Sequence, residues 1–337
     1  MNDHSWVPID IHTHIVPEHI HPPTGARPAR WPEIEHVPGC NHAHVMIDGR
    51  NFRTITDECW SVERRAEAMQ SMGIGRQALS PMPELLSYWL DAELAREMAR
   101  QVNEAIAKMV AQDPVRFCGL GMVPLQDPEL AARELETLMR NGQFRGVEIG
   151  SNVNGTPIGD PRFEDFFRTA EELGAAVFVH ALHPAGLDRL VGPPALAALI
   201  AFPCETAFAI ASLITGGVIL RHPRLRMAFS HGGGAFASIL PRLSHGWRVM
   251  DGLSPVQDQI SPLEQARGLF YDTLVYDPDT LRFLIERFGA SQLCIGTDHP
   301  FQIQEPEPIA AVDALALDET TRGLLLSGNA RRFLGEA

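Results

Sequence analysis

Two histidines, His12 and His14, follow directly after an apolar run near the N-terminus, in the stretch VPIDIHTHIVPEH. Side chains of a β-strand alternate between its two faces, so residues two apart point to the same side. Imidazole is a common ligand of divalent metal ions. Two imidazoles on one side of a buried strand therefore suit half of a metal site, and the other half has to come from elsewhere in the chain.

Further residues of these kinds stand at the ends of other apolar runs: His180 ends AAVFVH, His231 ends RMAFSH and Asp298 ends QLCIGTD. One histidine after an apolar run is usually structural, but five such groups at strand ends make coincidence a poor explanation. Three imidazoles and one carboxylate with an open position suit zinc or a similar divalent ion. We predict one such ion bound by His12, His14, His180 and Asp298, with His231 left to act as an acid–base.

Several residues compete for these roles. The chain has a single lysine, Lys108, inside a helical pattern, so no carbamylated lysine is available to bridge two metals at a strand end. Glu148, near the end of the fourth apolar run, could bridge instead, although strand alternation could equally turn it away. His183 competes with His180, which ends its apolar run directly. The histidines of HAH (42–44) follow VPGCN, which is typical of a turn, and we expect them in a loop.

Along the sequence, short apolar runs alternate with amphipathic stretches, and these segments must form the elements that position the candidate site residues. The runs predict parallel strands covered on both faces, at Val7–His12, Arg76–Pro81, Phe117–Val123, Phe144–Gly150, Ala176–His180, Leu225–His231, Gly268–Val275 and Gln292–Asp298. Residues 91–112 and 160–173 show helical spacing and helix start signals. Eight repeats of strand and helix predict an α/β protein with a (β/α)8 TIM barrel. We expect one domain over 1–337, with a lid-like insertion at 17–60 after the first strand.

Composition narrows the class of partner and the location. The net charge is −14 over 337 residues, which argues against nucleic acid or an anionic membrane as a partner. The five cysteines show no CxxC spacing, and the start of the chain shows no signal peptide pattern, so we expect a cytoplasmic protein. The most apolar region, Pro193 to Leu220, is interrupted by Pro203 and Glu205 and is interpreted as a buried helix or interface, not as a membrane span.

Taken together, IDIHTHIVPEH, VFVH, FSHGGGAF and IGTDHPF resemble the amidohydrolase superfamily. GRNFRTITDECWSVERRAEAM (49–69), LSYW (86–89), residues 202–234 and GNARRFLG (328–335) point to its decarboxylase branch, and there to the 2-amino-3-carboxymuconate-6-semialdehyde decarboxylases. The resemblance covers nearly the whole chain. It implies a zinc ion on His12, His14, His180 and Asp298, a water activated by His231, and non-oxidative loss of CO2 after hydroxide adds to a conjugated double bond.

The resemblance also assigns two arginines to the substrate. Arg53, in FRTIT, matches an arginine that binds the substrate carboxylate, and Arg242, in LPRLSHG, matches one that reaches in from a neighbouring protomer. A guanidinium suits a carboxylate because it donates paired, charge-assisted hydrogen bonds. If Arg242 serves a neighbour, activity requires at least a homodimer.

The chain also departs from this branch around the substrate. HALHPAGLDRL stands where the branch usually has His-Pro-Trp-Asp, LVGPPALAALIAF lacks an expected tryptophan, and Glu148 stands where glutamine is common. We therefore expect a metal-dependent decarboxylase of an unsaturated or aromatic carboxylate such as 2-amino-3-carboxymuconate-6-semialdehyde. Two alternatives stay open: a hydrolase or hydratase of a lactone, amide or ring-cleavage acid, and a non-catalytic metal-binding barrel with a closed coordination shell.

Overall fold

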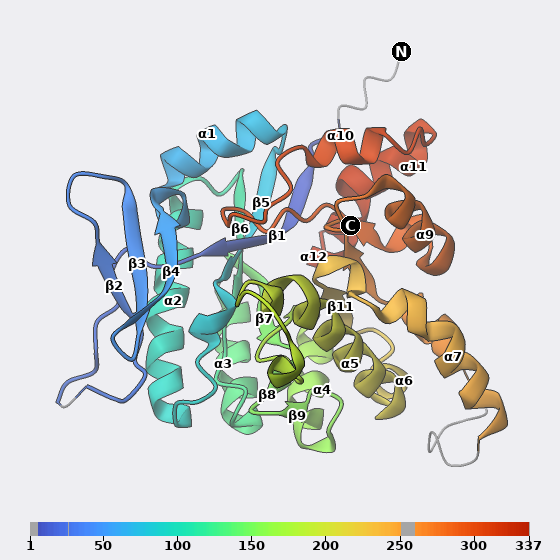
Figure 1. The fold of residues 1–337 in the computed structure, drawn as a ribbon, viewed down its shortest axis with the longest axis horizontal. Helices are drawn as coiled ribbons and strands as arrows, with labels where there is room; N and C mark the ends of the chain where they lie inside the picture. Colours follow the sequence, from blue (N-terminus) through green and yellow to red (C-terminus); the bar gives the residue numbers. More distant parts are fainter. Residues whose placement is uncertain (1–5, 26, 251–259, 337) are drawn as a thin grey trace.

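Eight parallel strands form a barrel in the computed structural model, which describes residues 6–25, 27–250 and 260–336 (Figure 1). In order around the barrel they are β1 (Ile9–Ile15), β5 (Arg76–Pro81), β6 (Phe117–Gly121), β7 (Phe144–Gly150), β10 (Ala176–His180), β11 (Arg226–Phe229), β12 (Phe270–Asp272) and β13 (Leu293–Cys294). The last strand returns to the first, because the amide of Ile11 donates to the carbonyl of Ile295 at 2.9 Å. The predicted (β/α)8 barrel is confirmed.

All eight predicted strands are present: β5, β7 and β10 have the predicted bounds, and the ends of the other five are shifted. β1 continues to Ile15 because its last residues pair with the end of β5, His14 opposite Ser80 and Ile15 opposite Pro81. His12 and His14 therefore lie inside a strand, not at its end. The expectation that the sixth and eighth strands run to His231 and Asp298 was wrong, since β11 stops at Phe229 and β13 at Cys294. Both residues lie in the loops that follow.

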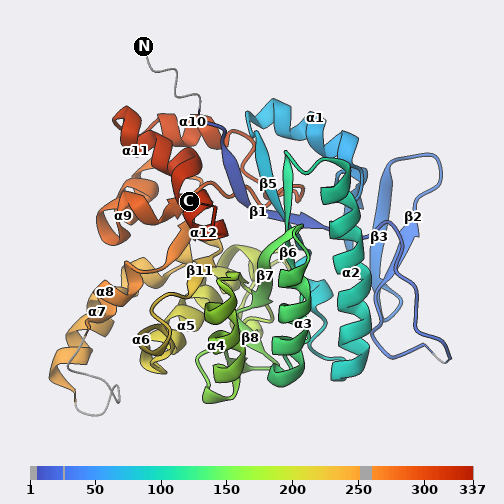
Figure 2. The ribbon, with the colours of Figure 1, turned by 180° about the vertical axis from the view of Figure 1, so that it is seen from behind.

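Helices surround the barrel, as Figures 1 and 2 show from opposite sides. The two helices predicted from spacing are confirmed: Asp91 caps the first by accepting from the amide of Leu94, and a turn at Pro161–Phe163 leads into the second. The helices are α1 (Val62–Met72), α2 (Ala92–Gln112), α3 (Pro128–Arg140), α4 (Glu164–Leu173), α5 (Phe202–Thr215), α6 (Val218–Arg221), α7 (Phe236–Val249), α8 (Pro262–Ala266), α9 (Pro278–Phe288), α10 (Pro308–Asp313), α11 (Glu319–Gly323) and α12 (Asn329–Leu334).

A small apolar cluster fills part of the barrel. It joins side chains from seven of the eight strands to Phe333 and Leu334 of α12. Strands on opposite sides of a barrel can share contacts only through its interior, so this cluster is a packed core and not a pore. A larger cluster lies between the strands and the surrounding helices, and contains the fully buried Phe166 and Phe167 of α4.

The predicted insertion forms a three-stranded antiparallel sheet of β2 (Glu33–His36), β3 (His42–Ile47) and β4 (Arg50–Thr56). In both views this sheet lies beside the barrel next to α2. The loop expected at residues 42–44 is instead the start of β3, because Ala43 and Val45 are buried and pair with both neighbouring strands. That the insertion acts as a lid stays a prediction. A two-stranded sheet, β8 (Asn152–Val153) and β9 (Thr156–Pro157), follows β7.

Within the described ranges, one stretch, Ala197–Thr215, is long and apolar enough by length and composition to cross a membrane, with a mean hydropathy of 1.9 over its most apolar window. It comprises a π-helical turn at Ala197–Ala201 and α5. Helices that pack against a protein core pass the same test, and 44% of that window is buried within this fold. Ile210, Leu213 and Ile214 are fully buried, which agrees with the prediction of a packed helix.

Replacement of Phe167 by alanine tests the packing of the helix layer. We expect a loss of about 3–5 kcal/mol in the free energy of unfolding, because the deletion leaves a cavity at a fully buried site of α4. Leu173→Ala, at the partly exposed end of the same helix, is the matched control and should cost about 1 kcal/mol or less. Urea denaturation followed by circular dichroism measures both, and equal losses in the two variants would contradict this description of the core.

Candidate metal centre

The four predicted metal ligands converge at the carboxyl ends of the barrel strands. Each of His12, His14, His180 and Asp298 offers one ligand atom, and these atoms all lie within 4.8 Å of one another. The four side chains are buried. They come from β1, β10 and the loop after β13, so the cluster exists only because the barrel closes. This position is where barrel enzymes place their chemistry.

A hydrogen bond on the far side of each ring fixes its orientation. His12 Nδ1 lies 2.6 Å from Asp272 Oδ2, His14 Nδ1 lies 2.9 Å from the carbonyl of Pro81, and His180 Nδ1 lies 2.7 Å from the carbonyl of Ala181. Each Nδ1 has only acceptors beside it, so it carries the proton and donates. The lone pair of each neutral ring is therefore on Nε2, the atom that faces the cluster.

The three Nε2 lone pairs lie close to the carboxylate of Asp298. His12 Nε2 lies 3.1 Å from His14 Nε2, and Asp298 Oδ1 lies 2.9 Å from His14 Nε2, yet in the described part of the chain this buried oxygen has no hydrogen-bond partner. With all three rings neutral, the four atoms are acceptors without a donor between them and repel one another. A cation among them, either the proton that His12 takes up when no metal is bound or a divalent metal ion, removes that repulsion. The donor set and its orphaned oxygen therefore fit a divalent metal ion.

The titration behaviour of the cluster agrees with a site built for positive charge. Burial disfavours the charged form of His12, but the hydrogen bond to Asp272 outweighs it and raises the pKa of His12 to about 9. Burial lowers the pKa of His14 to about 4. The pKa of Asp298 is held well below its usual range, since His14 and His12 outweigh its burial.

The backbone of the loops after β13 and β11 brings Asp298 and His231 close to the histidines of the cluster. A Cβ on Gly296 would lie 2.6 Å from the Cβ of Asp272 and 2.9 Å from the Cβ of His12, so only glycine allows the chain after β13 to pass there. His231 begins a 3₁₀ turn (His231–Gly233), and its ring centroid lies 5.1 Å from that of His180. Burial lowers the pKa of His231, whose Nδ1 has no hydrogen-bond partner among residues 6–25, 27–250 and 260–336.

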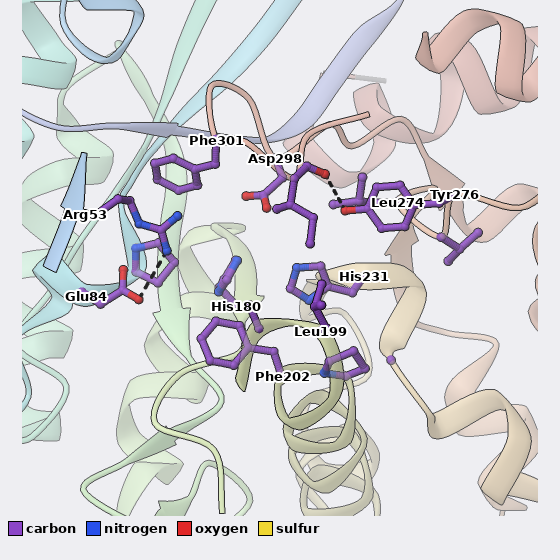
Figure 3. A pocket seen from close by; sticks show the side chains of 16 residues that line it. Arg53, Glu84, His180, Leu199, Phe202, His231, Leu274, Tyr276, Asp298 and Phe301 are labelled. Atoms are coloured by element: carbon purple, nitrogen blue, oxygen red, sulfur yellow. Dashed lines mark hydrogen bonds and ion pairs between the residues drawn. The ribbon is translucent and has the colours of Figure 1, made fainter. Parts of the chain in front are cut away.

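A cavity of about 340 Å³ opens onto this cluster (Figure 3). Asp298, His180 and His231 form its inner wall, and Gly234, from the glycine run after His231, lines it too. Arg53 reaches the cavity from β4, and its guanidinium carbon lies 4.2 Å from the centre of the Phe301 ring. Most other lining residues are apolar: Ala198, Leu199, Phe202, Leu274, Val275 and Ile303.

The structure separates the predicted residues into those at the cavity and those away from it. Arg242 is exposed on α7, which extends away from the barrel, and it does not line the cavity of its own chain (Figure 1). His183 is exposed and packs near Trp89, so His180 occupies the cluster. Glu148 is fully buried with its nearer oxygen 3.7 Å from His14 Nδ1, outside the four-residue group.

Among the described residues, the histidines at 42 and 44 belong to no candidate metal group. His44 instead lies within hydrogen-bonding distance of Thr54 and Asn51 on the neighbouring strand. A second group of possible ligands in that part of the chain, Glu18, His19 and His36, is exposed at the surface.

Sequence reasoning missed two acidic residues at the site. Asp272 orients His12 and also accepts hydrogen bonds from the amides of His231 and Gly232 at 2.9 and 2.7 Å. The sequence feature that could have identified Asp272 is its position as a single carboxylate inside the apolar run GLFYDTLVY. Glu84, which lies in a 3₁₀ turn after β5 (Pro83–Leu86) and lines the cavity beside Arg53, carried no such signal.

Comparison with known proteins agrees with this architecture. The chain is 37% identical over 332 residues to a 2-amino-3-carboxymuconate-6-semialdehyde decarboxylase of Dictyostelium discoideum, covering 97% of this chain and 91% of that one. The crystal structure of Metarhizium anisopliae IDCase in apo form superposes with a TM-score of 0.84 at 21% identity, over 100% and 99% of the two chains.

A third comparison concerns a protein solved with a metal. The 5-carboxyvanillate decarboxylase of Novosphingobium aromaticivorans, complexed with manganese and 4-hydroxy-3-methoxy-5-nitrobenzoic acid, matches with a TM-score of 0.73 at 25% identity. The match covers 83% of this chain and 82% of that one. The Amidohydrolase family profile matches residues 9–335. The chain therefore belongs to the amidohydrolase family, and the relatives named here include decarboxylases of that family.

Proposed function

We propose that this protein is a metal-dependent, non-oxidative decarboxylase of an unsaturated or aromatic carboxylate, with 2-amino-3-carboxymuconate-6-semialdehyde as the first candidate substrate. One observation carries the proposal: a cluster of three imidazoles and a carboxylate opens onto a largely apolar cavity that also holds an arginine and a free histidine. The candidate substrate is the one named for the Dictyostelium relative. The apolar walls suit a conjugated or aromatic skeleton, and Arg53 suits its carboxylate.

The metal in this proposal is one divalent ion held by His12, His14, His180 and Asp298. Zinc is the first candidate from the donor set, and manganese is the metal named for the Novosphingobium structure. When bound, such an ion polarises ligands and lowers the pKa of a coordinated water to about 7. Asp298 thereby has two roles, as a ligand and as a catalytic residue beside the substrate.

His231 moves the proton in this proposal. It lies at the cavity wall, and none of the described residues is a hydrogen-bond partner of its Nδ1. Its lowered pKa keeps the ring neutral near pH 7, so the ring can accept a proton and return it to the carbon that loses CO2. Asp272 holds the backbone of His231 in place through the amide of that residue.

Arg242 contributes to the site of a neighbouring protomer in this proposal. Among the described residues that line the cavity, Arg53 is the only arginine or lysine. Arg242 lies on the projecting helix α7, exposed and outside its own cavity, which suits a residue shared across a homodimer interface. We also infer a reducing, cytoplasmic location, since the five cysteines are all unpaired.

Replacement of Asp272 by asparagine tests the metal assignment. We expect zinc affinity to fall about 10- to 100-fold, because His12 loses the charged partner that fixes its tautomer and raises its basicity. Zinc content after dialysis against chelator buffers measures the change, and Asp188→Asn, at an exposed site, is the control. A wild-type protein that retained no divalent metal, or an Asp272→Asn variant with unchanged affinity and an intact fold, would contradict the assignment.

The reaction is tested by following substrate absorbance and CO2 release together. Zinc- or manganese-loaded protein with freshly prepared 2-amino-3-carboxymuconate-6-semialdehyde should release one CO2 for each substrate lost. His231→Asn should retain its metal and lose about 10²- to 10⁴-fold in kcat, because the proton carrier is gone; His42→Asn, exposed on β3, should match wild type. Absorbance loss without CO2 would instead identify a hydratase or hydrolase.

Mixed dimers test the sharing of Arg242. Arg53→Ala and Arg242→Ala proteins should each be inactive, yet a random mixture should recover about a quarter of wild-type activity, since half the dimers then hold one intact composite site. Activity of subunits mixed after mild dissociation is the measurement, and sedimentation confirms that dimers re-formed. No recovery in re-formed dimers would rule out a site composed of both arginines.

A further inference from the structure

A second group of possible metal ligands lies apart from the cavity, where the inserted sheet meets the segment that follows β1. Glu18 and His19 belong to that segment, and His36 is the last residue of β2. Each of the three offers one ligand atom, and these atoms all lie within 4.8 Å of one another. The ring centroids of His19 and His36 are 5.1 Å apart, the same separation as between His12 and His180 in the buried cluster. The group therefore has the spacing of a metal site.

A hydrogen bond between two members already holds the group together. His36 Nε2 lies 2.9 Å from the carbonyl oxygen of Glu18. A carbonyl only accepts, so this nitrogen carries the proton and Nδ1 of the ring keeps the lone pair. Metal-binding histidines are commonly held in this way, with one nitrogen on a backbone carbonyl and the other on the ion. None of the residues that the structure describes forms an ion pair with the Glu18 carboxylate, so this group is also free to bind a cation.

The segment that carries Glu18 and His19 is fixed against α2 and the core. The amide of His21 donates to Gln101 Oε1 at 2.9 Å, and Gln101 Nε2 donates to the carbonyl of His21 at 2.8 Å. Ile20, between the two anchored positions, is buried in the larger apolar cluster. Because the backbone is already ordered, binding of an ion costs only the freedom of the side chains themselves.

The residue types select the kind of ion. Two imidazoles and one carboxylate suit zinc, with water in the remaining positions. All three residues are exposed, so they are hydrated before an ion binds. The site therefore lacks the repulsion between buried acceptors that favours a cation in the barrel, and we expect it to bind zinc more weakly than the buried cluster does.

We propose that Glu18, His19 and His36 bind a second divalent ion, with zinc as the first candidate, and that this ion fastens the inserted sheet to the segment after β1. The sheet has the order β2-β3-β4, and β4 carries Arg53, so the ion limits movement of the sheet that brings Arg53 to the cavity. In Figure 1 the inserted sheet and α7 lie on opposite sides of the barrel, so the site is clear of the interface proposed for Arg242. It goes beyond the proposed reaction and does not depend on it.

Zinc titration of protein whose buried cluster is already loaded tests the second site. We expect calorimetry to show one further zinc ion per wild-type chain. His36→Gln and Glu18→Gln should each bind it at least about 10-fold more weakly, since loss of an outer-shell partner alone costs about 10- to 100-fold in affinity. His42→Gln, at an exposed histidine of β3 outside the group, is the matched control and should bind zinc as wild type does.

Two results of the titration would overturn the site. One is a wild-type protein that binds no second ion, and the other is a second ion that all three variants bind equally well. Sedimentation at each zinc concentration completes the test, because exposed histidines of two molecules can also share an ion. Zinc-dependent association of wild-type protein that His36→Gln abolishes would place the ligands in two molecules and overturn a site within one chain.

Hydrogen exchange tests the fastening role separately. At a free zinc concentration ten times the dissociation constant of the second site, amides of β2 and β3 should exchange up to about tenfold more slowly, because opening of the sheet then requires release of the ion. His36→Gln should show no such slowing, and amides of β10, in the barrel wall, should be unaffected in either protein. A wild-type protein that binds the second ion with unchanged exchange in β2 and β3 would overturn the fastening role.

Discussion

The architecture of this protein depends on one electrostatic constraint, the convergence of three imidazole lone pairs and a carboxylate oxygen in a buried space. Such a cluster is unfavourable alone, because each acceptor is desolvated and faces another acceptor. The fold maintains it by tying each ring at its far nitrogen, to Asp272 and to the carbonyls of Pro81 and Ala181. Those ties stop the rings from turning to relieve the repulsion. They thereby preserve the preference of the cluster for a cation.

Closure of the barrel sets the relative positions of the residues in that cluster. The amide of Asp298 donates to the carbonyl of His12 at 2.9 Å, which joins the loop after β13 directly to β1. Gly296 lets the chain pass against both His12 and Asp272 on its way to that contact. Ligands almost 300 residues apart in the sequence are thus brought together by main-chain pairing, and only their final orientation is left to side chains.

Much of the metal side of the site could be predicted from the sequence, because each ligand follows an apolar run and parallel strands end at one rim. The strand ends were less certain: β1 continues past His12 through pairing with β5, and β11 and β13 stop short of His231 and Asp298. Local composition does not contain that information. Asp272 could have been identified from the sequence, because it is a charged residue inside an apolar run. The placement of Glu84 could not, because it depends on a turn whose direction is set by tertiary packing.

The difference in predictability between the metal cluster and the cavity lining has a structural cause. The proposed metal ligands belong to the barrel strands and their immediate ends, where hydrogen-bonded registers leave few alternatives. The other groups that line the cavity come from outside the barrel pattern: Arg53 from the inserted sheet, Leu199 from the π-helical turn before α5, and Glu84 from the turn after β5. Changes in those segments alter the cavity wall without moving the strands. The same set of metal-competent side chains can therefore be retained while the lining of the cavity changes.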